Sequence, residues 1–139
     1  MKRTGFALIL MCLITMELTV FESHCQVEFK KMAAGVRRKC LAESGTTAEI
    51  VDESEIGDFP DDRKLACYFK CILEKFNMFT KSGKLNFNLM RKIVPEHFKD
   101  IGYEMIDSCT DIYAQDRCDF AYDFMKCLYN ANPVAFIVV

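Results

Sequence analysis

Apolar side chains recur every three or four residues along most of this chain, which places them on one face of an α-helix. No stretch shows the strict alternation of apolar and polar residues that favours a β-strand. The pattern predicts six amphipathic helices, over about residues 29–44, 46–57, 63–76, 87–94, 95–112 and 117–128. We therefore expect a compact all-α domain.

Residues that commonly begin and end helices flank these stretches. Gly45 can end the first helix, and Thr46 with Glu49 resembles a capping box that opens the second. Asp61 or Asp62 is a natural N-cap for the third helix. Similar boundaries are expected at Asn86, Pro95 and Asp116.

The first 25 residues have the pattern of a secretory signal. Two basic residues are followed by an apolar run over 6–20, and 23–25 are similar to a signal-peptidase site. A membrane anchor is the alternative, but Glu17 interrupts the run and the run is short for a membrane span. We therefore expect residues 1–25 to be removed and residues 26–139 to form one mature domain.

Six of the eight cysteines remain in the expected mature chain. An even number of cysteines in a small secreted domain predicts disulfide bonds. Six cysteines allow fifteen pairings, and their spacing alone does not choose among them. Two of the six lie four residues apart on one predicted helix, where bonding to each other would be awkward. The six are Cys40, Cys67, Cys71, Cys109, Cys118 and Cys127.

Composition and charge disfavour several classes of function. A formal net charge of −2 gives no basic surface for nucleic acid. A metal site is not expected, because there is no CxxC pair and His97 is the only histidine after residue 25. The residues around His97 do not supply the nucleophile and orienting acid of a hydrolase. We expect neither an enzyme nor a bound cofactor.

The cysteine spacing, with its CxxxC and Cx8C elements, resembles that of the insect odorant-binding proteins of the six-cysteine type. Tyr68 directly after the second mature cysteine, the segment 56–60 and the Asn132-Pro133 tail are also similar to that family. The resemblance covers the whole mature chain. It implies a six-helix, disulfide-stapled domain that encloses an apolar cavity and carries small hydrophobic odorants or pheromones. It further implies the pairing Cys40–Cys71, Cys67–Cys118 and Cys109–Cys127.

Alignment on the cysteines implies a set of ligand-binding residues from several helices and the tail. They are Tyr68, Phe87, Met90, Val94, Tyr103, Met105, Met125, Leu128, Phe136 and Ile137. Leu128 stands where several relatives carry tryptophan, and Met125 where others carry histidine. These departures predict a drier, less selective pocket for an aliphatic or weakly polar molecule. The alternative is that methionine and phenylalanine at helical spacing simply fill the core.

The tail, residues 132–139, is wholly apolar after its proline. Because an exposed apolar segment favours aggregation, we expect it to pack on the helices and to form part of the cavity wall. In related proteins the residues equivalent to Arg37 and Tyr68 hold the terminal carboxylate, here that of Val139. The alternative is a solvated arginine and a tyrosine in the core.

The resemblance implies a small hydrophobic molecule as ligand and an olfactory receptor complex as candidate partner, in sensillum lymph or another body fluid. We expect a monomer or weak homodimer, without nucleic acid and without stable membrane insertion. Two alternatives stay open. One is a non-olfactory extracellular carrier of lipids or hormones, and the other is a saposin-like membrane-active protein, which the net acidic charge disfavours.

Overall fold

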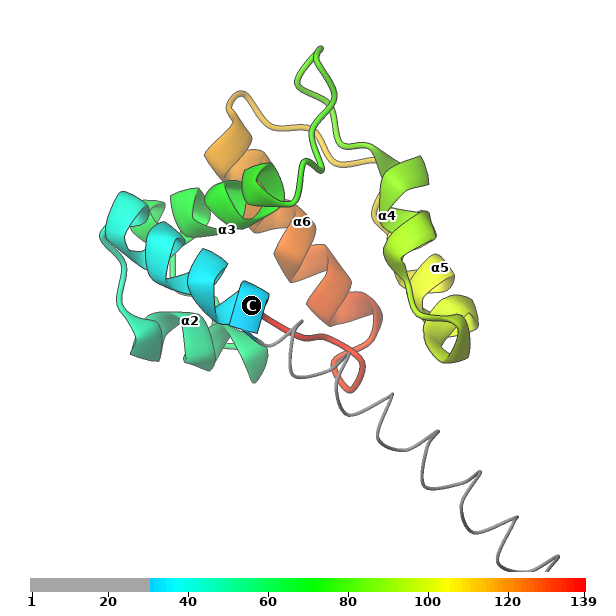
Figure 1. The fold of residues 1–139 in the computed structure, drawn as a ribbon, viewed down its shortest axis with the longest axis horizontal. Helices are drawn as coiled ribbons and strands as arrows, with labels where there is room; N and C mark the ends of the chain where they lie inside the picture. Colours follow the sequence, from blue (N-terminus) through cyan, green and yellow to red (C-terminus); the bar gives the residue numbers. More distant parts are fainter. Residues whose placement is uncertain (1–30) are drawn as a thin grey trace, which may run out of the picture. The chain divides into compact units, whose positions relative to one another are not determined.

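Residues 31–139 are the part of the chain that the structure, a computed structural model, describes (Figure 1). The expected signal segment, residues 1–25, lies outside them. The packing described below is that of residues 36–139, which form one compact unit. The described chain begins in a helix that ends at residue 44, followed by α2 (Ala48–Glu55), α3 (Arg63–Lys75), α4 (Phe87–Ile93), the 3-10 helix η1 (Glu96–Phe98), α5 (Lys99–Ser108) and α6 (Arg117–Ala131). The prediction of an all-α fold is confirmed.

Capping side chains set where most of these helices begin. Asp62, Asn86 and Asp116 each accept hydrogen bonds from main-chain N–H groups in the first turn of α3, α4 and α6, respectively. The predicted start of α2 is one residue early, because Thr47 is its N-cap and accepts from a first-turn N–H at 3.4 Å. Thr46 is buried instead, in the connection between the two helices.

The predicted helix over residues 95–112 is shorter than expected and has two parts. Pro95 precedes the turn η1, and α5 begins only after that turn and ends well before residue 112. A proline disfavours helical backbone in the residue before it, and Val94 is extended, with ψ 123°. The inward apolar face predicted for this helix is therefore incomplete. Two of its residues, Phe98 and Ile101, are 43% and 40% exposed.

The centre of the unit is the packing of α3 against α6 (Figure 1). On α3, Leu65, Tyr68 and Phe69 are almost fully buried. On α6, Ala121 and Phe124 are fully buried as well. Spacings of three and four residues put each set on one helix face. Burial of each large side chain contributes about 1.5–3 kcal/mol, so these two faces form the main core.

Three disulfides join helices that are far apart in the sequence, in the pairing that the resemblance implies. Cys40–Cys71 ties the first described helix to α3, Cys67–Cys118 ties α3 to α6, and Cys109–Cys127 ties the end of α5 to α6. Their sequence separations are 31, 51 and 18 residues. In the chain-entropy account, loops of this size give each bond a stabilisation of about 3–4 kcal/mol.

Helices α4 and α5 form a hairpin that packs on α6 through α5. Gly102 allows α5 to approach the end of α4 closely, because an added Cβ there would lie 2.7 Å from Val94 Cγ1. An ion pair between Arg91 of α4 and Asp107 of α5 joins the same two helices. The hairpin is therefore fastened internally by a close contact and by an ion pair.

Gly102→Ala is expected to destabilise the protein by about 1 kcal/mol, although alanine is the better helix former. The propensity gain of up to about 1 kcal/mol is outweighed by overpacking against Val94, which typically costs about 1–3 kcal/mol. Urea unfolding with intact disulfides measures the change. In a Val94→Ala background the same substitution should be neutral or stabilising. A Gly102→Ala protein as stable as the wild type would contradict the close contact.

Candidate ligand-binding site

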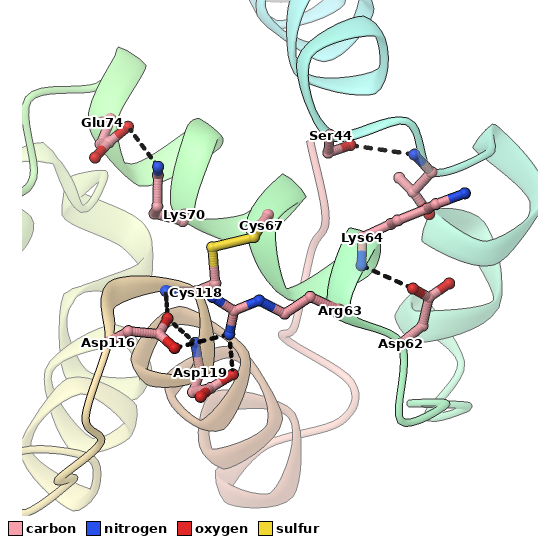
Figure 2. Close-up of a disulfide and its surroundings, with 11 residues drawn as sticks. Ser44, Asp62, Arg63, Lys64, Cys67, Lys70, Glu74, Asp116, Cys118 and Asp119 are labelled. Atoms are coloured by element: carbon pink, nitrogen blue, oxygen red, sulfur yellow. Dashed lines mark hydrogen bonds and ion pairs between the residues drawn. A yellow bond between two sulfur atoms is a disulfide. The ribbon is translucent and has the colours of Figure 1, made fainter.

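The frame of the candidate site is the joint between α3 and α6 (Figure 2). Beside the Cys67–Cys118 disulfide, Arg63 of α3 contacts Asp116 and Asp119 of α6, at 2.8 and 2.5 Å. The Arg63 guanidinium, aided by main-chain N–H groups, holds the pKa of the Asp116 carboxyl well below its usual value. A depressed carboxyl pKa adds stability above about pH 4 that is lost only as the pH falls through the depressed value. The joint therefore keeps this ion pair at neutral pH.

Apolar side chains of α4, α5 and α6 share one core cluster. Five of the predicted ligand-binding residues belong to the core or pack against it here, and we call them the inner apolar surface: Phe87, Met90, Met105, Met125 and Leu128. Met125 is buried and the other four are half-buried. Three of these five residues are methionines, whose flexible thioethers can adapt to an irregular apolar shape.

The other predicted ligand-binding residues are placed differently. Tyr68 and Phe136 are buried within the core. Val94 and Tyr103 are half-buried outside the core cluster. Ile137 is 70% exposed, so the structure does not bring it to the inner apolar surface.

The tail is buried on one side only. Phe136 is 5% exposed and its ring centroid lies 5.6 Å from that of Tyr129. Val134 and Ile137 are 97% and 70% exposed, so the expectation that the whole tail is buried is wrong for these two residues. The physical reason is that a single irregular segment lying on helices has nothing to cover its outer side.

Sequence reasoning missed Phe59, which lies at the centre of an aromatic cluster. The centroids of four other rings lie 5.7–6.2 Å from its own, those of Phe69, Tyr122, Tyr129 and Phe136. Each such pair adds about 0.5–1.5 kcal/mol beyond the burial of area. The sequence carries two signals at this position, a lone aromatic residue inside an acidic turn and the similarity of the segment 56–60 to the family. Neither of them shows whether the ring is buried or exposed.

We call the predicted hold of Arg37 and Tyr68 on the Val139 carboxylate the latch. Tyr68 reaches the last residue of the sequence, as the latch requires, but Arg37 does not. The Tyr68 hydroxyl donates to a main-chain oxygen of Val139. Arg37 donates to Asp52 at 2.6 Å and to the Ala48 carbonyl at 3.3 Å, both in α2. Arg37 therefore fastens α2 rather than the tail, because the Asp52 carboxylate lies within hydrogen-bonding distance of its guanidinium.

Two open hollows are lined wholly by described residues. One, of about 410 Å³, lies beside Phe87, and the other, of about 380 Å³, is lined mainly by aspartates of α6 and of the turn before α3. Both are open to solvent, and neither is the enclosed apolar cavity that the resemblance implies.

No group of three or more His, Cys, Asp or Glu residues in the described part of the chain is arranged to hold a metal ion. None of the helices between residues 31 and 139 has the length and apolar content needed to span a bilayer.

Known proteins share both the sequence pattern and the fold of this chain. The sequence model of the PBP/GOBP family matches residues 22–131. The chain belongs to this family of insect odorant-binding proteins. It is 27% identical to general odorant-binding protein 19d of Drosophila melanogaster over 129 residues, which cover 88% of this chain and 85% of that protein.

Solved odorant-binding protein structures have the same fold. Odorant binding protein 5 of Apis mellifera is 32% identical and superimposes with a TM-score of 0.75, covering 81% of this chain and 95% of that one. Odorant binding protein 7 of Anopheles gambiae, in complex with an azo compound, is 26% identical with a TM-score of 0.70, covering 78% of this chain and 89% of that one. The family resemblance inferred from the cysteine spacing is therefore confirmed.

Phe136→Ala is expected to lower the free energy of unfolding by about 3–5 kcal/mol, because it removes a buried ring from the aromatic cluster. Ile137→Ala, one residue further on, should change it by less than about 0.5 kcal/mol, because that side chain is already exposed. Urea unfolding followed by circular dichroism measures both variants. Equal losses would mean that the tail does not pack as the structure shows.

Tyr68→Phe is expected to remove a tyrosine whose hydroxyl loses its proton at a higher pH than an exposed tyrosine does. Burial raises the pKa of Tyr68 to about 12. A raised pKa stabilises the folded state below the ordinary tyrosine pKa of about 10, and this contribution is lost as the pH rises through about 12. The absorbance titration of tyrosinate, taken as wild type minus Tyr68→Phe, should therefore have its midpoint near 12. A midpoint at the ordinary value would show that Tyr68 is solvated.

Proposed function

We propose that this chain carries a small hydrophobic molecule bound at the inner apolar surface. The observation that carries the proposal is the half-burial of Phe87, Met90, Met105 and Leu128, which pack on the core and still keep accessible area. Ligand sites are lined mainly by apolar side chains of this kind. The complex of the related Anopheles gambiae protein with an azo compound supports a small organic molecule as ligand.

In this proposal the ligand lies between α6 and the α4–α5 hairpin, and the helices close an apolar cavity around it. The packing of the hairpin supports this arrangement, because α4 packs mainly on α5. Helix α5 is held to α6 by the Cys109–Cys127 disulfide. With the helices held in this way, the flexible side chain of Met90 can adjust to ligands of different shape without loss of the core. Met125 and Leu128 make the α6 side of the site apolar, which suits an aliphatic or weakly polar ligand.

The biological setting that we propose is olfactory transport in an extracellular fluid. The three disulfides support an oxidising compartment. We propose that residues 1–25 direct secretion and are removed, and that a monomer or weak homodimer delivers the ligand to an olfactory receptor complex. Carriage needs no catalytic step, and His97, the one histidine of the proposed mature chain, is exposed in η1.

Met90→Gln should weaken the binding of a fluorescent naphthylamine probe about tenfold, because it puts a polar amide of nearly the same shape into the apolar wall. Ile93→Gln is the matched control on the same helix, since Ile93 is 57% exposed and should leave affinity unchanged. Fluorescence titration with intact disulfides measures both. Failure of the wild-type protein to bind any apolar probe would refute the carrier function. Equal losses in the two variants would place the ligand elsewhere.

A further inference from the structure

The open hollow of about 410 Å³ lies directly beside the inner apolar surface. Its walls come from the turn before α4, from α4 itself and from the loop after α5. They are Thr80, Leu85, Asn86, Phe87, Asn88, Arg91 and Thr110. A volume of this size is within the range of small-molecule sites, which is about 300–1,000 Å³.

The polar side chains of this hollow are two amides, two hydroxyls and one guanidinium, and no carboxylate lines it. Asn86 uses its amide oxygen to accept from the main-chain N–H of Leu89, at 3.1 Å, which leaves its NH₂ group as the donor toward a ligand. Asn88, the second residue of α4, is exposed. The hollow therefore offers mainly hydrogen-bond donors, which suits a ligand group that accepts hydrogen bonds.

Arg91 brings a positive charge to these donors. One of its terminal nitrogens donates to Asp107 of α5, and no other hydrogen bond to a described residue uses the guanidinium. The ion pair with Asp107 thus orients the group and leaves most of its N–H donors for a second acceptor. A planar guanidinium with several donors matches the geometry of a carboxylate.

Phe87 connects the hollow to the interior. It is a wall of the hollow and a member of the inner apolar surface. Its ring also meets that of the fully buried Phe124 edge-on, with centroids 6.2 Å apart. A molecule with its polar end among the donors would therefore meet apolar side chains as soon as it passed Phe87.

We propose that this hollow binds the carboxylate of an amphiphilic ligand, such as a long-chain carboxylic acid, whose apolar chain continues past Phe87. Arg91 is the residue that selects the carboxylate, and Asn86 and Asn88 donate to the same group. The inference rests on the proposed carrier function for the apolar part of the ligand. It adds a ligand class and a specificity-determining residue to that function.

The test compares dodecanoic acid with its methyl ester, by isothermal titration calorimetry at a neutral pH where the acid is ionised and below its micelle concentration. The wild-type protein should bind the acid about tenfold more tightly than the ester, because only the acid forms a charge-assisted hydrogen bond with Arg91. Arg91→Gln should reduce the affinity for the acid to that for the ester, and it should leave the affinity for the ester unchanged. Asn88→Asp places a carboxylate at an exposed position of the same hollow, and it should weaken the binding of the acid but not that of the ester.

Two control variants separate recognition from structure. Asp107→Asn removes the charge of the ion pair but keeps a side-chain oxygen that can accept from Arg91 and orient it, so the preference for the acid should persist. Lys92→Gln removes the neighbouring exposed charge, and the preference should again persist. Equal affinity for acid and ester in the wild type, or a preference that survives Arg91→Gln, would overturn the carboxylate site and leave the carrier function standing. Binding of neither molecule would overturn the carrier function itself.

Discussion

The covalent and apolar joint between α3 and α6 is the constraint on which the rest of the structure depends. Cys67 fixes α3 to Cys118 of α6, and the buried faces of the two helices pack together around that bond. One turn further along α3, Cys71 fixes the same helix to Cys40. A helix held on two sides by bonds of about 3–4 kcal/mol each leaves its neighbours little freedom of position.

Different kinds of side chain pack on the two sides of α6. Toward the tail, rings pack around Phe59, and the cluster includes Phe136. On the α4–α5 hairpin, Phe87, Met90 and Met105 are half-buried and pack against the core, and the Phe87 ring meets that of Phe124 on α6. Aromatic packing is specific in geometry, whereas thioethers adapt, so one side holds the fold and the other suits a variable ligand. The disulfides offset the core packing that such an adaptable side lacks.

Much of the candidate site was predictable, because its residues lie on helices whose inward faces are set by periodicity and by the resemblance. Phe87, Met90, Met105, Met125 and Leu128 belong to the core cluster or pack against it, and their role in binding stays a prediction. The tail and the latch were less predictable, since no local rule says which tail side chain turns inward or which carboxylate an arginine meets. Arg37 meets Asp52 only because the first helix and α2 are brought side by side.

By itself, the sequence determined the helices, most of their caps and the cysteine row that identifies the family. These features depend on interactions within a few residues, such as helical periodicity and the hydrogen bonds of Asp62, Asn86 and Asp116. Only the tertiary structure decided that Phe59 packs against the core, that Ile137 is outside, and that Arg91 lines a hollow next to the apolar surface. Such placements depend on contacts between segments distant in the sequence, and no local interaction encodes them.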